Sequence, residues 1–223
     1  MISLFWRQCM RDLLLVWREF RHLLNASLFF IMVPVFFALT LPADSAHIRT
    51  TAPGLFWIAT LFAFMLQSER LFVEDFEDGH LEQWILSGYP LYLLAGARLL
   101  VHWLSTLLPL LLLTPLIGVF FGFNRFETLV LAASLVCATP ALALLCALTA
   151  AFSLGVRQRG MLMALVVLPL AVPVMIFGSG AVSAAIAGQA VSGLLALLLA
   201  ASLLAIILLP FAIAGALRVR VAG

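Results

Sequence analysis

The stretch LYLLAGARLLVHWLSTLLPLLLLTPLIGVFF, residues 91–121, is predominantly apolar and contains one charged residue, Arg98. A helix that crosses the hydrocarbon core of a lipid bilayer needs about 20 apolar residues in succession. The stretch therefore predicts a membrane-spanning helix. Because it is longer than a straight crossing requires, we expect it to tilt or to kink near Pro109 and Pro115.

The rest of the chain has the same character. Hydrophobic residues make up 65% of the 223 residues and charged residues 10%, a composition outside the range of soluble domains. We therefore expect an all-α polytopic membrane protein in which residues 1–223 form a single transmembrane domain. The apolar stretches and their punctuation predict six spans, at residues 25–41, 53–67, 91–121, 126–154, 161 onward and 194–217.

Residues 1–23 have the pattern of an amphipathic helix. Polar residues recur on one side (Arg7, Gln8, Arg11, Asp12, Arg18, Glu19 and His22), and apolar residues cover the other side (Trp6, Met10, Leu13, Leu14, Trp17, Phe20 and Leu24). Such a helix lies in the membrane interface, with the charged side chains toward water and the aromatic rings at the level of the headgroups.

The arginines predict the orientation of the chain. All twelve basic residues are arginine, and with the N-terminus inside, nine of them fall on the cytoplasmic side: Arg7, Arg11, Arg18, Arg21, Arg70, Arg157, Arg159, Arg218 and Arg220. Only Arg49 and Arg125 fall in the outer loops, a clear positive-inside bias. Both termini are therefore expected in the cytoplasm, and Arg98 is expected to extend to the inner interface. A net charge of +2 without a basic patch argues against a nucleic-acid partner.

Residues 174–192 differ from the other apolar stretches because they are rich in Gly, Ala and Ser and carry no formal charge. This composition favours a re-entrant helical hairpin near the outer face, since irregular backbone at membrane depth must be buried in protein. A plain loop that follows a frayed helix end is the alternative.

Residues 68–90 contain six of the ten acidic residues of the chain, all between Glu69 and Glu82. Helical spacing predicts that the second span continues into the cytoplasm until Gly79 ends it, and that residues 81–87 form a second short helix. Leu81, Trp84 and Ile85 share one face, which is expected to fill an apolar groove of a soluble partner. The alternative is a charged surface that is merely solvated. The candidate contact residues are Glu69, Arg70, Asp75, Asp78, Gly79, Leu81, Glu82, Gln83 and Trp84.

Motifs of this segment carry a family resemblance. The sequence DGHLEQW (78–84), preceded by ERLFVED (69–75), resembles the cytoplasmic coupling helix of ABC-2-type permeases, although Trp84 stands where Leu is usual and Ser87-Gly88 replaces a more Leu/Pro-like turn. The chain as a whole resembles the CcmB family, the haem exporter B proteins of cytochrome c maturation. Further matching stretches are APGLFW (52–57), HW (102–103), LPLLLLTPL (108–116), TP (139–140) and LVVLPLAVPVMIFG (165–178).

The resemblance implies a permease of ABC-2-type architecture in the bacterial inner membrane, with no nucleotide chemistry of its own. ATP would be hydrolysed by a CcmA-like ATPase subunit. The further partners it implies are CcmC-like and CcmD-like haem-handling membrane proteins, a CcmE-like haem chaperone contacted indirectly, and a second permease copy. Haem would be a transported or handled ligand and not a resident cofactor. A permease for a lipid or a drug, and a non-transporting assembly scaffold, are the alternatives.

The residues themselves indicate no catalytic or metal site. A Walker A motif requires Lys, which the chain lacks, and neither an H-E-x-x-H motif nor a mid-span carboxylate is present. His102 is the one ionisable residue deep in a span. It could ligate haem, but a hydrogen bond to a neighbouring helix is the favoured interpretation.

Overall fold

The structure is a computed structural model that describes residues 2–18, 20–40, 45–156 and 158–222, with only the backbone described at 2–4, 15–18, 20–26, 38, 45–47 and 222. The described residues form helices and turns, without strands. The helices are α1 (Ile2–Arg18), α2 (Phe20–Thr40), α3 (Ser45–Ser68), α4 (Val73–Glu77), α5 (His80–Leu86), α6 (Leu91–Phe120), α7 (Arg125–Phe152), α8 (Arg159–Ile186) and α9 (Ser192–Ala222). The prediction of an all-α protein is confirmed.

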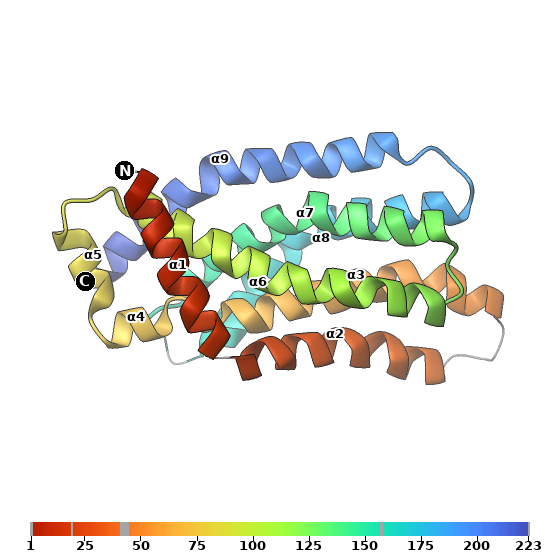
Figure 1. The fold of residues 1–223 in the computed structure, drawn as a ribbon, viewed down its shortest axis with the longest axis horizontal. Coiled ribbons are helices and arrows are strands. Elements are labelled where there is room, and N and C mark those ends of the chain that lie inside the picture. Colours follow the sequence, from red (N-terminus) through yellow and green to blue (C-terminus); the bar gives the residue numbers. More distant parts are fainter. Residues whose placement is uncertain (1, 19, 41–44, 157, 223) are drawn as a thin grey trace.

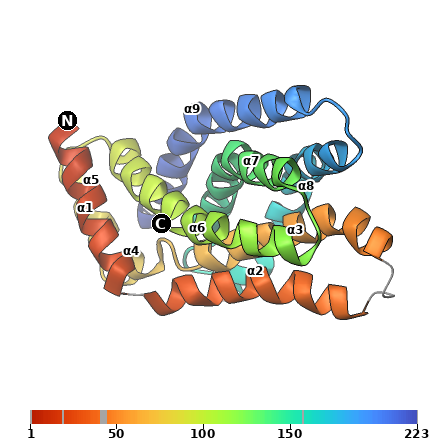
Figure 2. The ribbon, with the colours of Figure 1, turned by 45° about the vertical axis from the view of Figure 1, so that its right-hand side comes forward.

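The long helices α2, α3, α6, α7, α8 and α9 run side by side along the molecule, and α1 lies across one end of them (Figure 1). The short helices α4 and α5 and both ends of the chain lie at that same end, which we call the α4/α5 end. Helix α7 lies inside the bundle, where it packs against α3, α6, α8 and α9 (Figure 2).

Five parts of the described chain are long and apolar enough to cross a bilayer: Ile48–Glu77, Leu91–Phe120, Arg125–Phe152, Arg159–Ile186 and Ser192–Val221. Helix α2 contains a shorter apolar segment, Ser27–Phe37, and packs against α3, so the first predicted span, at residues 25–41, stays a prediction. Large apolar side chains such as Leu112, Leu165 and Ile207 point outward from the bundle. An exposed apolar surface around helices with satisfied backbones is what a lipid solvent requires, and the chain is a multi-pass membrane protein.

The predicted re-entrant hairpin at residues 174–192 is wrong. Helix α8 continues without interruption to Ile186, and a short turn in which Gly188 has a φ of 69° leads into α9. The small residues serve close helix packing instead: the ring of Trp57 occupies the place of a Cβ on Gly178, and Ala181 and Ala185 are buried beside Val130. Small residues let the backbones of membrane helices approach one another.

Helix α1 forms as predicted. Trp6, Leu13 and Leu14 are exposed, and so are Arg7 and Arg11. Asp12 is the exception on the polar side, because it is buried against the bundle. The position of α1 in the membrane interface stays a prediction. Arg18, Glu19 and His22 lie outside the described side chains.

Candidate functional site

The sequence predicted that the second span continues as a helix into the acidic segment, and this prediction is wrong. Helix α3 ends at Ser68, and residues 69–72 form turns in which Leu71 and Val73 donate backbone hydrogen bonds to Ser68 and Arg70. Phe72 is fully buried and Leu71 nearly so. The turns place these two side chains in a buried cluster with the ends of α6, α7 and α9, and the burial of apolar surface favours this path of the chain.

The second half of the segment follows the prediction closely. Gly79 has a φ of 72°, the left-handed conformation that separates α4 from α5. Helix α5 then covers His80–Leu86, one residue ahead of the predicted helix at 81–87. Glu82 lies in its first turn, where the helix dipole favours an anion. Gly88, also with a φ of 72°, turns the chain back toward α6.

The apolar face of α5 contacts this chain and not a partner, which corrects the predicted role of two residues. Leu81 is 1% exposed and Trp84 7% exposed. Both belong to a buried cluster with residues from the ends of three spans: Leu91 and Leu94 of α6, Ala147 and Ala151 of α7, and Ile213 and Leu217 of α9. The amphipathic pattern correctly required burial of this face, but the groove it fills is in the same molecule.

The opposite face of α5 is the one that remains accessible. Glu82 and Gln83 are exposed, and Leu86 is 84% exposed. Sequence reasoning did not single out Leu86, although its position out of phase with Leu81 and Trp84 was a signal that it faces away from the bundle. The other exposed candidate residues on this segment are Glu69, Arg70 and Asp78. Glu74, Glu77 and Tyr89 are exposed too, although the sequence did not predict a contact for them.

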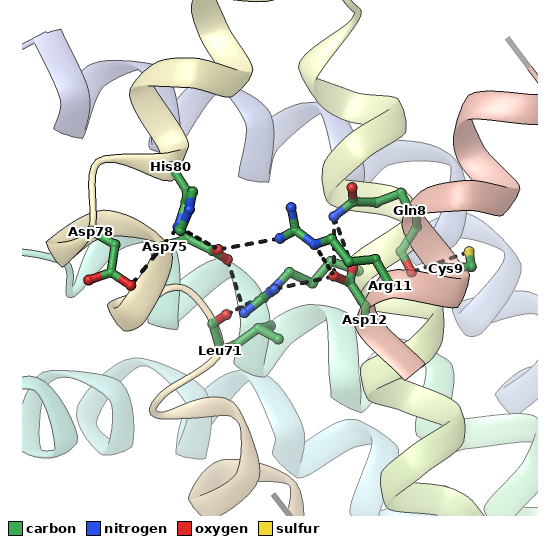
Figure 3. A network of polar contacts seen from close by, with 10 residues as sticks. Gln8, Cys9, Arg11, Asp12, Leu71, Asp75, Asp78 and His80 are labelled. Carbon is green, nitrogen blue, oxygen red and sulfur yellow. Dashed lines mark hydrogen bonds and ion pairs between the residues drawn. The ribbon is translucent and has the colours of Figure 1, made fainter. Parts of the chain in front are cut away.

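Asp75 is the exception among the acidic residues, because it is buried inside a charge network (Figure 3). Its Oδ2 lies 2.9 Å from Nη2 of Arg98 on α6. This is a close ion pair without a regular hydrogen bond, since the N–H does not point at the oxygen. Nη1 of Arg98 lies 3.5 Å from Oδ1 of Asp12 on α1, and Nε donates to the carbonyl of Leu71 at 3.0 Å. Arg98 therefore extends toward the α4/α5 end, where carboxylates of the same chain pair with it, and its position at the membrane interface stays a prediction.

Further polar groups complete the charge network. Arg11 lies 3.5 Å from Asp12 and 3.7 Å from Asp75, and Gln8 donates to both carboxylate oxygens of Asp12 at 3.2 Å. The ring of His80 lies 3.9 Å from Asp75. Burial raises the pKa of Asp12 above its ordinary value, and the attraction of Arg98 and Arg11 offsets this only in part. The network has two carboxylates and two guanidinium groups, so its formal charge is balanced.

These features lie in a chain whose relatives are known. A sequence model of the family described as CcmB protein matches residues 3–220. The chain belongs to the CcmB family. It is 43% identical over 211 residues to the heme exporter protein B of Pseudomonas aeruginosa, which covers 95% of both chains. It is 39% identical over 209 residues to that of Haemophilus influenzae (94% and 95%), and 36% identical over 218 residues to that of Escherichia coli K12 (98% and 99%).

In this CcmB-family chain His102 has the structural surroundings that the sequence favoured. It is buried on α6, and its Nε2 lies 2.8 Å from Oγ of Ser68 at the end of α3. Its backbone carbonyl accepts hydrogen bonds from Ser105 and Thr106. The hydrogen bond to a neighbouring helix is confirmed.

The opposite end of the CcmB-family bundle contains one close ion pair that the sequence did not predict. Nη2 of Arg49 donates to Oε1 of Glu127 at 2.6 Å and so joins α3 to α7. Glu127 also accepts from the backbone and the side chain of Asn124, which caps α7. Charged residues therefore join neighbouring helices at both ends of the bundle.

Proposed function

We propose that this chain is the permease subunit of an ABC-type haem export complex that acts in cytochrome c maturation. Membership of the CcmB family and the relatives named heme exporter protein B support this function. The observation that carries it is the form of α5, a short helix outside the spans with one buried and one exposed face. Such a helix can receive the motion of a partner on one side and pass it to the bundle on the other.

The exposed face of α5 is the surface that a CcmA-like ATPase subunit contacts. Glu82 supplies charge and Gln83 supplies hydrogen bonds. Leu86 supplies an apolar contact, because its exposed side chain gains free energy when a partner removes it from water. The buried face transmits the motion, because Leu81 and Trp84 pack against the ends of α6 and α9. ATP is bound and hydrolysed on the partner, and this chain supplies no nucleotide chemistry.

The complex lies in the bacterial inner membrane with the α4/α5 end in the cytoplasm. The arginine bias supports this orientation, because arginines at the cytoplasmic side of a membrane protein outnumber those outside. The residues at the α4/α5 end include Arg70, Arg159, Arg218 and Arg220. Reporter fusions after Asp78 are expected to read as cytoplasmic, and fusions after Arg49 or Arg125 as periplasmic. A cytoplasmic signal after Arg125 would contradict the orientation.

An ABC permease consists of two membrane halves, and one chain of this size supplies only one of them. The chain pairs with a second permease copy, works with CcmC-like and CcmD-like membrane proteins, and promotes release of a haem-loaded CcmE-like chaperone. Helices α8 and α9 display the most extensive apolar outer faces, which suits contacts within the membrane. The native mass of the purified complex is expected to correspond to two permease copies and two ATPase subunits.

The test separates the two faces of α5. Leu86→Asp and Glu82→Arg are expected to leave the chain folded and inserted, and to reduce co-purification of the ATPase about tenfold or more. Trp84→Ala removes a buried side chain and is expected to destabilise the chain by about 3–5 kcal/mol. Glu74→Gln, an exposed change on α4, is the matched control and should bind the ATPase like the wild type.

Release of the haem-loaded chaperone is measured in the same strains and distinguishes haem work from export of another substrate. Full ATPase binding by both Leu86→Asp and Glu82→Arg would show that the exposed face of α5 is only solvated. Unchanged release of the haem-loaded chaperone in variants that have lost the ATPase would instead point to a different substrate.

A further inference from the structure

Every nitrogen of the Arg98 guanidinium faces an acceptor from a different part of the chain. Nε donates to Leu71 in the turn after α3, Nη1 lies near Asp12 of α1, and Nη2 lies near Asp75 of α4. Arg98 itself belongs to α6. One side chain thus joins four segments at the end of the bundle where the ATPase is proposed to dock.

The chemistry of the network requires arginine. A planar guanidinium spreads its positive charge over three nitrogens, which here lie close to three separated acceptors, whereas a Lys ammonium is a single point charge that cannot lie close to all three. The side chains of Asp12 and Asp75 are 4% and 6% exposed, and that of Arg98 is 14% exposed. Removal of the cation would leave two buried carboxylates with only the half-exposed Arg11 between them, which is costly at such depth.

Helix α1 has few other attachments among the described contacts. It packs on α6, where Cys9 lies against Ala97 and Val101. Its outer face exposes Trp6 and Leu14, which suits the membrane interface. Two ion pairs therefore link this interfacial helix to the rest of the network: Asp12 lies 3.5 Å from Arg98 of α6, and the half-exposed Arg11 lies 3.7 Å from Asp75 of α4.

We propose that Arg98 is a positioning residue that makes α1, the α4–α5 segment and the start of α6 move as one unit when the ATPase displaces α5. This inference rests on the proposed function. It predicts that the interfacial helix shifts with the coupling segment in each ATP cycle, so that motion of the ATPase reaches the membrane surface as well as the spans.

The experiment uses the assembled permease–ATPase complex in lipid nanodiscs. Spin labels are placed at Arg7→Cys on α1 and Glu74→Cys on α4, two exposed positions, after Cys9, Cys137 and Cys146 have been replaced by Ala. The distance between the labels is measured without nucleotide and with bound ATP. Retention of the ATPase and ATP-dependent release of the haem-loaded chaperone are measured on the same variants without labels.

In the wild type the distance distribution is expected to be narrow and the same in both states. In Arg98→Gln the ATPase is expected to be retained, while the distribution broadens and chaperone release falls at least tenfold. Arg98→Lys keeps the positive charge but loses the three separated nitrogens. Its distance distribution and its chaperone release should lie between those of the wild type and Arg98→Gln. Arg125→Gln, at an exposed arginine on the opposite end of the bundle, is the control and should match the wild type.

An Arg98→Gln complex with wild-type distances and wild-type release would overturn the proposal. If that variant does not assemble, Asp12→Asn and Asp75→Asn each remove one carboxylate and are expected to broaden the distribution partially, and wild-type behaviour of both would overturn it equally. Loss of the ATPase from the wild-type chain would instead contradict the proposed function. The label distances in the permease alone would then still decide whether Arg98 holds α1 to α4.

Discussion

The ring of Trp57 on α3 occupies the space that a Cβ of Gly178 on α8 would need. Gly178 is buried and lies in a helix that also contains Pro169 and Pro173. The contact explains why a glycine is found in the middle of a membrane helix, where it has no cap or turn to form. Helices α3 and α8 approach each other closely because this side chain is absent.

Gly178→Ala is expected to destabilise the chain by about 1–3 kcal/mol, because the added methyl group must displace a buried indole. Gly180→Ala is the matched control. A Cβ there meets only Cδ1 of Leu194, at 3.9 Å, so the better helix propensity of Ala should leave stability unchanged or slightly increased. Unfolding in mixed detergent micelles measures both. Equal stability of the two variants would show that Trp57 can move aside at little cost.

The ion pair between Arg49 and Glu127 should respond differently to the loss of each partner. The Glu127 side chain is 2% exposed and the Arg49 side chain 38% exposed. Arg49→Gln leaves a buried carboxylate without its cation and is expected to cost about 2 kcal/mol. Glu127→Gln leaves a cation that water can reach, so a smaller loss of about 1 kcal/mol is expected. Thermal unfolding of both variants and of the double variant measures the difference, and a larger loss for Glu127→Gln would contradict it.

Ser202 of α9 is inserted into the hydrogen-bond ladder of α7 beside Pro140. Its Oγ donates to the carbonyl of Cys137 and accepts from the N–H of Ala141 at 3.3 Å. An uninterrupted helix would join these two backbone groups directly, so the hydroxyl bridges a local break. Ser202→Ala should leave both groups poorly paired in a buried site and destabilise the chain by about 1–2 kcal/mol.

The control for Ser202 is Ser183→Ala on the exposed side of α8, which should have no measurable effect. The comparison is made by unfolding in detergent, and amide exchange at Ala141 reports the bridge itself. Faster exchange is expected in Ser202→Ala. Unchanged exchange at Ala141 would mean that the helix ladder closes without the hydroxyl.

The raised pKa of Asp12 gives a prediction for pH. Burial is the largest cause of the shift, so the ionised carboxylate is less favourable in the folded chain than in the unfolded chain. The stability contributed by protonated Asp12 is complete below the ordinary carboxyl value of about 4 and is lost as the pH rises through the higher folded value. The stability advantage of the wild type over Asp12→Asn should therefore fall between pH 4 and neutrality.

Unfolding of the wild type and Asp12→Asn across this pH range tests the sign of the effect. Asn cannot titrate, so the difference between the two proteins isolates residue 12. A wild-type advantage that grows with pH would show that Arg98 and Arg11 attract the carboxylate more strongly than burial disfavours it.

Local features of the sequence were sufficient for the fold class and for several positions in the coupling segment. The apolar stretches set the helices because a bilayer requires backbone groups to be paired within each span. Gly79 could be identified as a helix end because a left-handed backbone favours glycine whatever surrounds it. The hydrogen bond of His102 followed from the cost of leaving a polar group unpaired at depth.

Only the tertiary structure decided what each apolar or charged face contacts. The pattern of Leu81 and Trp84 required burial, but burial is non-directional, and a groove in the same bundle satisfies it as well as a groove in a partner. The sequence did not show the carboxylate partners of Arg98, because Asp12 and Asp75 are distant from it along the chain. The small residues after Pro173 predicted irregular backbone, but the structure shows a continuous helix in which Gly178 leaves room for the ring of Trp57. Composition states which groups must be buried or paired, and the packing of distant helices determines their partners.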